Sequence, residues 1–261
     1  MKMKVSVYSL NGKKTGDTVE LPKVFEEDVR PDLIKRAVLS SQSARYQPQG
    51  RDPFAGKRTS AESWGPGRGV SRVSRVKGSR YSAAGRGAFI PQAVGGRLAH
   101  PPSAEKRIIK KINAKERRKA TASAIAATGI KELVGKRGHV IDKVPEIPLV
   151  VSDELESVKT AKEVKDAFSK LGLSDDLERA RDWKVRAGKG TMRGRRYKKK
   201  KSALLVISDD GGISLGAGNY SGVDVVKAEH LGVEQLAPGT HYGRLTVYTK
   251  SAIEKIAERF K

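Results

Sequence analysis

The sequence predicts an α/β protein, a three-layer domain with a mostly parallel sheet and helices on both faces, plus a long extended loop inserted between two helices. Short continuous apolar runs such as "ALLVI" and "PLVV" are typical of strands buried on both faces of a sheet. Segments with helical apolar spacing separate these runs, as they do in parallel α/β sheets. Between two helical segments, residues 46–102 contain ten glycines and no sustained apolar period, which is typical of a functional or disordered loop.

The first elements are a strand and a helix that precede the loop. "KVSVYSL" alternates apolar and polar residues with period two, and a turn-rich "NGKKTGD" and an extended "TVELP" follow it. A helix is expected over 31–46, with Pro31 in its first turn and Leu33, Ile34 and Val38 on one face. At 261 residues the chain can bury a sizeable core.

A second helix is expected after the loop, from near Ser103 towards Gly129. Its apolar stripe begins with Ile108, Ile109 and Ile112, and lysines and arginines cover much of the remaining surface. Such a helix could pack on the domain with one side and face a phosphate backbone with the other. We therefore expect a globular domain of residues 1–45 and 103–261 and a basic, glycine-rich loop at 46–102.

The rest of the chain alternates strands and helices. "IPLVVS", "SALLVIS", "VDVV" and "GRLTVYT" are the predicted strands, and a brief helix is expected directly after the first of them. A further helix opens with a capping box from Thr160 to Glu163 and ends at Gly172. The last helix is expected to begin at Ser251, with Glu254 completing a capping box.

The charge of the chain is concentrated in three windows. The formal net charge is +24, and residues 42–103, 104–119 and 183–201 hold 11, 8 and 10 cations with 2, 2 and 0 acids. The remaining 164 residues are close to neutral. A single charged run is often only a solvated surface. Three runs without acidic balance favour a polyanionic partner, nucleic acid first and an anionic membrane second.

Several other classes of protein are disfavoured. The absence of cysteine excludes disulfides, thiolate zinc sites and a cysteine nucleophile. The N-terminus has no signal-peptide pattern and no apolar run is long enough to span a membrane, so we expect a soluble intracellular protein without a membrane partner.

Motifs of nucleotide enzymes fail on spacing. In "AGKGT", Lys189 precedes Gly190, and in "GAGNYSG" (216–222) the third glycine lies one residue late for a dinucleotide fingerprint. The four histidines share no metal-ligand spacing. Asp209 and Asp210 of "SDDGG" suit a strand-terminating turn better than a pair of catalytic carboxylates. We therefore predict no enzyme activity, cofactor, metal site or small-molecule substrate.

RNA binding is the function that the remaining features support. Arginine forms bidentate contacts with phosphate oxygens, and glycine allows close backbone approach to a ligand. Aromatic rings among cations can stack on unpaired bases, and the loop contains such rings; small packing clusters within the loop are the alternative role for them. They are Tyr46, Phe54, Trp64, Tyr81 and Phe89.

The chain resembles the universal L4 family (uL4) of large-subunit ribosomal proteins, in its archaeal form. The resemblance is carried by "VYSLNGKKTGDTVELPKVFEEDVRPDLIKRAV", "GRDPFAGKRTSAESWGPGRGVSRV", "GGRLAHPP", "RAGKGTMRGRRYKKKKSALLVI" and "GVDVVKAEHLGVEQLAPGTHYGRLTVYTKSAIEKI". It covers most of the chain in the family's order. It implies a cytoplasmic structural constituent of the large ribosomal subunit, in contact with 23S-type rRNA and neighbouring ribosomal proteins. It also implies that the loop reaches the wall of the polypeptide exit tunnel. A free regulator that binds an mRNA leader with the same basic surface remains the alternative.

The candidate RNA-binding residues are 20 of the 29 cations in the three windows, with one tryptophan and one histidine. They are Arg45, Arg51, Lys57, Arg58, Trp64, Arg68, Arg72, Arg75, Lys77, Arg80, Arg86, Arg97, His100, Lys106, Arg107, Lys110, Lys111, Arg186, Lys189, Arg193, Arg195 and Arg196. The resemblance places a tunnel-facing tip at roughly 65–75, where several glycines favour a tight bend. The tip residues are Gly65, Gly67, Arg68, Gly69, Arg72 and Arg75.

Overall fold

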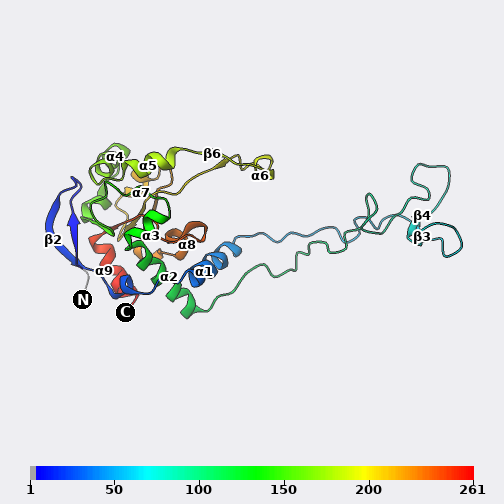
Figure 1. The fold of residues 1–261 in the computed structure, drawn as a ribbon, viewed down its shortest axis with the longest axis horizontal. Coiled ribbons are helices and arrows are strands. Elements are labelled where there is room, and N and C mark those ends of the chain that lie inside the picture. Colours follow the sequence, from blue (N-terminus) through cyan, green and yellow to red (C-terminus); the bar gives the residue numbers. More distant parts are fainter. Residues whose placement is uncertain (1–3) are drawn as a thin grey trace. The chain divides into compact units, whose positions relative to one another are not determined.

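The structure, a computed structural model, describes residues 4–261, and a large sheet forms the core of its α/β part (Figure 1). In that part of the chain the sheet has six strands in the order β2-β1-β5-β10-β8-β9. Its strands are β1 (Lys4–Tyr8), β2 (Lys14–Glu20), β5 (Leu149–Val151), β8 (Leu204–Ile207), β9 (Asp224–Lys227) and β10 (Thr246–Thr249). All neighbouring strands run parallel except β1 and β2, which pair antiparallel. The prediction of a mostly parallel sheet is confirmed.

The three central strands, β5, β10 and β8, are buried along their whole length. Because successive side chains of a strand point to opposite faces, β8 supplies both sides of the core. Leu205 and Ile207 pack into one apolar cluster, whereas Leu204 and Val206 pack into the other. Each such side chain contributes roughly 1.5–3 kcal/mol through its burial. The continuous apolar runs of the sequence therefore correspond to strands covered on both faces.

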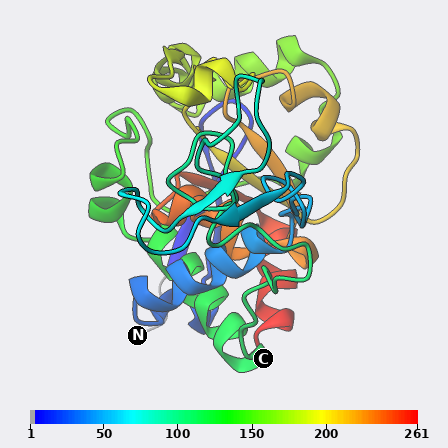
Figure 2. The same cartoon turned by 90° about the vertical axis from the view of Figure 1, so that its right-hand side faces the viewer.

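Helices cover both faces of the sheet (Figures 1 and 2). One layer consists of η1 (Lys23–Glu26), α1 (Pro31–Ser43), α2 (Ala114–Thr128), η3 (Ala228–His230), α8 (Val233–Leu236) and α9 (Lys250–Arg259). The other consists of α3 (Lys131–Lys136), η2 (Asp153–Ser157), α4 (Ala161–Lys170), α5 (Ser174–Arg181) and α7 (Ile213–Ala217). A short η4 (Pro238–Thr240) precedes β10. The predicted three-layer arrangement is confirmed.

The second helix begins eleven residues later than the sequence predicts. Residues 103–113 are outside any helix, and α2 begins at Ala114 with Asn113 as its extended N-cap residue. Two causes explain the error. Lysines and arginines at helical spacing in "EKRIIKK" repel one another. Of the predicted apolar stripe, Ile112 packs against the core but Ile109 is 55% exposed, so the stripe is covered only in part. Instead, the Lys110 carbonyl accepts a 2.6 Å hydrogen bond from the Ser40 hydroxyl.

The predicted caps are correct at one helix and displaced at another. The Thr160 hydroxyl accepts a hydrogen bond from the Glu163 backbone N–H at 3.3 Å, as expected for α4. In α9, however, Thr249 is the N-cap and accepts from the Ala252 N–H. The Ser251 hydroxyl donates instead to Asp153 at 2.8 Å. This competing long-range carboxylate is not visible in the local sequence.

The chain forms two compact units, one of Met1–Gln42 with Lys110–Lys261 and the other of Ser43–Ile109. The first unit holds the sheet and also a basic hairpin, in which β6 (Lys184–Val185) pairs with β7 (Tyr197–Lys198) around the short helix α6 (Lys189–Met192). The second unit has long irregular arms and a two-stranded sheet of β3 (Ala61–Ser63) and β4 (Ser74–Val76).

Candidate nucleic-acid interface

The basic hairpin, residues 183–201, extends away from the sheet of its own unit (Figure 1). None of its residues is buried. Backbone bonds hold its two sides together, including a 2.7 Å bond from the Arg186 N–H to the Arg196 carbonyl. The Arg186 Nε donates to the Arg195 carbonyl at 3.0 Å. The hairpin therefore presents cations on a defined backbone that has no apolar core of its own.

Aromatic rings lie among the cations of the hairpin. The rings of Trp183 and Tyr197 are 5.9 Å apart, and the Lys199 ammonium lies 4.0 Å from the Trp183 ring. The Arg196 guanidinium lies 5.6 Å from the Tyr197 ring. Both rings are more than 40% exposed. Exposed rings beside cations can stack on unpaired RNA bases.

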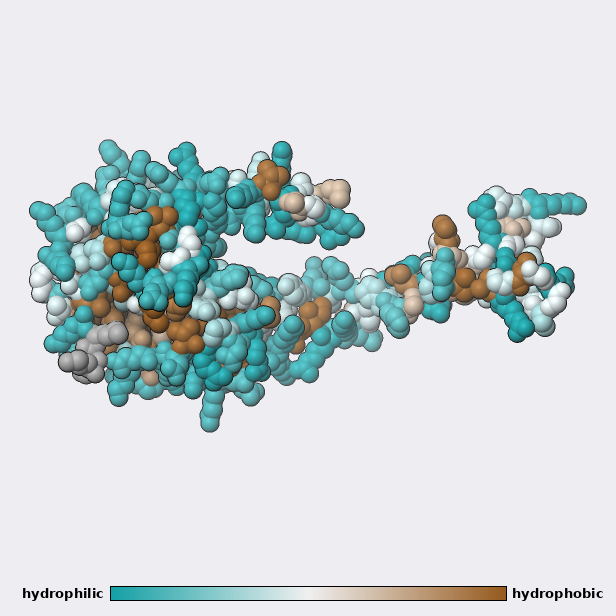
Figure 3. Space-filling view, in the orientation of Figure 1, coloured by the Kyte–Doolittle hydropathy of each residue, from teal (hydrophilic) through white to brown (hydrophobic). Residues whose placement is uncertain are grey.

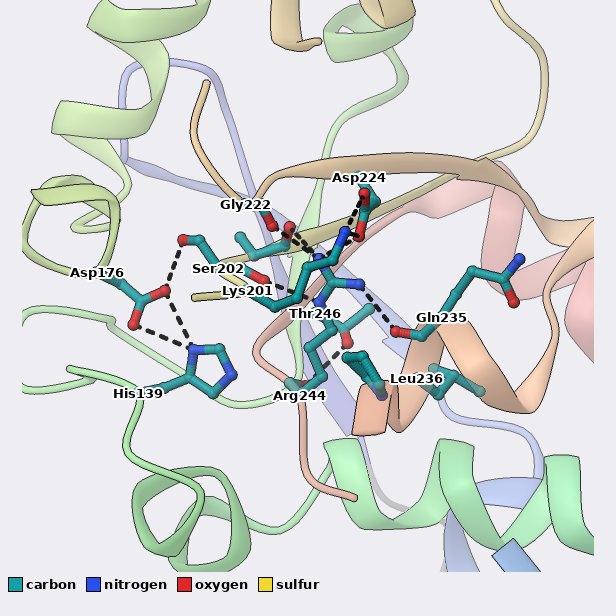
Figure 4. Close-up of polar contacts among 12 residues, drawn as sticks. His139, Asp176, Lys201, Ser202, Gly222, Asp224, Gln235, Leu236, Arg244 and Thr246 are labelled. Atoms are coloured by element: carbon teal, nitrogen blue, oxygen red, sulfur yellow. Dashed lines mark hydrogen bonds and ion pairs between the residues drawn. The ribbon is translucent and has the colours of Figure 1, made fainter. Parts of the chain in front are cut away.

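A buried polar network fixes the base of the hairpin to the sheet (Figure 4). Asp176 of α5 accepts hydrogen bonds from the Ser202 hydroxyl at 2.6 Å and from Arg179 Nε at 2.9 Å, and His139 Nδ1 lies 3.1 Å from both carboxylate oxygens. Arg179 also donates to the Lys201 carbonyl at 2.8 Å. Burial alone raises the pKa of the Asp176 carboxyl, but the hydrogen bonds outweigh it and hold that pKa well below its usual range.

A buried arginine completes the network. Arg244 is fully buried before β10 and donates to the Ser202 carbonyl at 2.8 Å and to the Gly222 carbonyl at 2.9 Å. Its charge is paired with Asp224, at 2.7 Å. Because an unpaired buried charge is very unfavourable, these contacts strongly favour one position for the chain at Ser202, where the hairpin ends.

The two arms of the second unit approach each other closely. A Cβ on Gly56 would lie 2.5 Å from the Gly96 carbonyl carbon, so only glycine fits at this contact. The Arg51 N–H donates to the Pro102 carbonyl at 3.2 Å. One cavity of about 930 Å³ is lined by residues of both arms. They include three candidate RNA-binding residues, Arg45, His100 and Lys106, and the aromatic Tyr46. The structure thus brings together residues from both ends of the predicted loop.

The tip of this unit is an ordered turn on a small sheet. Gly65, Gly67 and Gly69 all have φ between 66° and 81°, a region that favours glycine. Arg75 of β4 is used inside the tip, since its guanidinium donates to the Gly85 carbonyl at 3.0 Å and lies 5.3 Å from the Trp64 ring. The geometry gives Arg75 an internal role in addition to any external contact.

The predicted RNA-binding residues are at the surface in both units. All of them are exposed except Arg51, Arg75, Arg97 and Arg186, which are half-buried. In residues 44–113 the single buried apolar side chain is Ala88. Hydrophilic side chains dominate the visible surface of the hairpin and of the second unit (Figure 3). These segments expose charge and bury very little apolar surface.

Acids neutralise only a small part of this charge. In residues 42–103, Asp52 pairs with Arg58 and Glu62 pairs with Lys77. These are the two acids against eleven cations in that window. Tyr46, Phe54, Trp64 and Tyr81 are each between 47% and 63% exposed. The rings and most of the cations are therefore accessible to a partner.

The "AGKGT" segment and the "SDDGG" carboxylates, both weighed above as enzyme features, have other structural roles. Lys189 and Gly190 lie in α6, which forms the turn of the hairpin between β6 and β7 and is not next to a strand of the large sheet. Asp210 accepts bonds from the Gly212 and Ser214 N–H groups at the start of α7, and Asp209 pairs with Lys255 at 3.0 Å. The expected turn after β8 is confirmed.

The carboxyl ends of two central strands are closed by a side chain. Glu156 accepts hydrogen bonds from the Ser208 N–H at 2.6 Å and from the Thr249 hydroxyl at 2.7 Å. Open α/β sheets usually bind their ligands in a crevice at this edge. Here a protein carboxylate occupies the donors at the ends of β8 and β10.

Three cations at the base of the hairpin were not predicted from the sequence. Lys136, Arg137 and Arg179 line one cavity together with three lysines of the hairpin, Lys198, Lys200 and Lys201. They come from α3, from the residue after it and from α5, which have no basic run of their own. No spacing in the sequence indicates that these segments meet.

Membrane-spanning helices and clusters of metal ligands are both absent from the described residues, 4–261. No helix there is both long and apolar enough to cross a membrane. In the same residues no group of three or more histidine, aspartate or glutamate side chains is arranged to hold a metal ion.

Comparison with known proteins gives one consistent family. Residues 19–259 match the model of the ribosomal protein L4/L1 family. The chain is 58% identical to a large ribosomal subunit protein uL4 of Methanopyrus kandleri, over 98% of this chain and 99% of the relative. It is 55% identical to the protein of that name in Methanosphaera stadtmanae, over 99% and 98% of the two chains. For the one in Methanococcus aeolicus the identity is 52%, over 99% and 100%. The chain therefore belongs to the ribosomal protein L4/L1 family.

Proposed function

We propose that the protein is a structural constituent of the large ribosomal subunit in the cytoplasm, and that it binds large-subunit rRNA without a catalytic role. One observation carries the proposal: two separate cationic segments, the hairpin 183–201 and the unit Ser43–Ile109, expose their charge and have almost no core of their own. Relatives at 52–58% identity bear the name large ribosomal subunit protein uL4.

The physical basis is that RNA supplies what these segments lack. A chain that buries little apolar surface cannot offset the entropy of ordering its backbone. Phosphates provide partners for the arginines and lysines, and the release of counterions drives the association. The α/β unit, with its two apolar clusters, supplies a folded base for the hairpin and a surface for neighbouring ribosomal proteins.

Sedimentation of cell extracts through a sucrose gradient tests the proposal. We expect the protein to migrate with the large subunit at moderate salt and to remain there at high salt, because many contacts must break together. Recovery only in the light fractions at both salt concentrations would contradict the proposal and would favour a free regulator that binds an mRNA leader.

We propose further that residues 65–75 reach the wall of the exit tunnel, as the family resemblance implies, and that the arms supply most of the affinity. Exposed Arg68 and Arg72 represent the tip, whereas Arg51 and Lys57 represent the arms. We expect Arg68→Ala/Arg72→Ala to enter purified large subunits normally but to alter passage of nascent chains or binding of tunnel-directed antibiotics.

The matched variant removes the same charge from the arms. Arg51→Ala/Lys57→Ala should lower incorporation into large subunits, because it removes phosphate contacts along the path of the loop. If the tip variant blocks incorporation and the arm variant does not, the two roles have been assigned the wrong way round.

A further inference from the structure

A cationic cavity lies at the base of the hairpin, beyond the residues that the sequence predicts to bind RNA. Its volume is about 630 Å³, and it lies between α3, the hairpin and the loop that precedes β10. Six cations line it: Lys136, Arg137, Arg179, Lys198, Lys200 and Lys201. Among the residues that the structure describes, no aspartate or glutamate contributes to the lining.

Carboxylates outside the lining form ion pairs with only half of these six cations. Arg179 pairs with Asp176, Lys200 with Asp182 and Lys201 with Asp224, at 2.8–2.9 Å. Within residues 4–261 no ion pair is formed by the other three, which are Lys136, Arg137 and Lys198. The cavity therefore keeps about three uncompensated positive charges at neutral pH.

Arg137 is the most constrained of the three unpaired cations. Its guanidinium donates to the carbonyls of Leu236 at 3.4 Å and Pro238 at 3.3 Å, and also to that of His241. These neutral acceptors hold the group in place but do not balance its charge. Burial, together with the nearby charges of Arg244 and Arg179, lowers the pKa of Arg137 to about 10. Asp176 opposes these effects in part, and an anion beside Arg137 would further favour its charged form.

Rings of His241 and Tyr242 also line this cavity. His241 is exposed and Tyr242 is half-buried, and both contribute to its lining. A ring beside unpaired cations suits a ligand that has both a phosphate and a flat base. Nucleotides of RNA combine the two, whereas an acidic peptide segment supplies the charge alone.

We propose that this cavity binds one nucleotide of single-stranded or bulged RNA, with its phosphate beside Arg137, Lys136 and Lys198 and its base against the rings of His241 and Tyr242. The proposal rests on the proposed function, since RNA is the partner in both. It adds a recognition site on the α/β unit, where the base of the hairpin forms one wall and α3 another.

Site-specific photo-cross-linking in assembled large subunits tests the proposal. A benzoylphenylalanine probe replaces one exposed residue at a time: His241 at the cavity, Met192 (82% exposed) in the hairpin, and Leu215 (83% exposed) on α7 as a control. We expect covalent attachment to RNA at His241 and Met192 and none at Leu215.

The other outcomes separate the two proposals. RNA attachment at Met192 but not at His241 would overturn the cavity site and leave the proposed function standing. Attachment of His241 to a protein would overturn it too and would identify an acidic protein segment as the occupant. Failure of both positions to reach RNA would contradict the proposed function itself.

Charge removal gives an independent measurement. Lys136→Ala/Lys198→Ala removes two exposed, unpaired lysines, and Lys162→Ala/Lys165→Ala removes two exposed lysines of α4 as a matched control. We expect the first pair to flatten the dependence of log affinity for large-subunit rRNA on log salt by roughly 1.5–2 units. The control pair should leave the slope unchanged, and equal slopes for the two variants would overturn the proposal.

Discussion

Arg193, Arg195 and Arg196 lie between α6 and β7 of the basic hairpin, and all three are exposed to solvent. Within residues 4–261 no carboxylate pairs with any of them, so their charges are free for phosphate groups. Replacing all three with alanine removes these charges without emptying a core, because no residue of the hairpin is buried. The folded α/β unit should therefore keep its stability.

The expected magnitude follows from counterion release. Each neutralised phosphate contributes about −0.7 to −0.9 to the slope of log affinity against log salt. If about six phosphates are neutralised, the unmodified protein should show a slope of roughly −4 to −5 with large-subunit rRNA. The triple variant should flatten that slope by roughly two to three units, one for each lost phosphate contact at most.

Fluorescence anisotropy with labelled large-subunit rRNA, at a series of potassium chloride concentrations, measures the slope directly. Lys23, Lys162 and Lys165 provide a matched control, because they are equally exposed but lie outside the three cationic windows. Their triple replacement with alanine removes the same charge and should leave the slope nearly unchanged. If the hairpin variant keeps the full slope, the hairpin is only a solvated surface and the reasoning fails.

Four further predictions concern stability and order. In limited proteolysis of the free protein, cleavage should concentrate within 46–102, because that segment buries almost no apolar surface; cuts spread evenly along the chain would contradict this. In urea unfolding, Gly172→Ala should destabilise the protein more than Gly138→Ala does. Both glycines have positive φ, but only at Gly172 would a Cβ meet a carbonyl oxygen, at 2.2 Å. Equal losses would show that the close contact relaxes. Asp176→Ala should cost about 3–5 kcal/mol, because it leaves buried partners without their carboxylate; a loss below about 1 kcal/mol would be inconsistent with that role. Folding lowers the pKa of both Asp176 and His139, so the unfolded chain binds more protons and stability should fall as the pH drops, first below about 6.5 through His139 and then below about 4 through Asp176. Urea unfolding between pH 7.5 and about 3 measures this, and a stability that stays constant or rises on acidification would refute it.

The local pattern of the sequence predicted the central strands because that pattern records burial directly. A run such as "ALLVI" is apolar throughout only where both faces of a strand are covered, and β8 is buried at every residue. The cap of α4 was predictable for a similar reason, since Thr160 and Glu163 contact each other within one turn. Signals of this kind depend on neighbours a few residues apart.

The errors occurred where a distant segment competes with a local signal. "AEKRIIKKINAKERRK" has helical spacing throughout, yet no helix forms before Ala114, because Ile109 is largely uncovered and the cations repel one another. Ser251 has the residue type of an N-cap, but Asp153, 98 positions away, accepts its hydroxyl. Local propensity is a weak preference that tertiary contacts override.

The sequence by itself determined that this chain has an α/β core and three concentrated cationic segments, because apolar periodicity and charge are properties of single stretches. The candidate RNA-binding residues within those stretches followed from the same information and from the family resemblance. Only the tertiary structure decided where the hairpin is fixed and which cations gather at its base. Asp176, Ser202 and Arg244 form one buried network, and Arg137 and Lys198 line one cavity, although they lie on segments far apart in the chain. Such contacts depend on how the strands and helices pack, and no residue spacing encodes them.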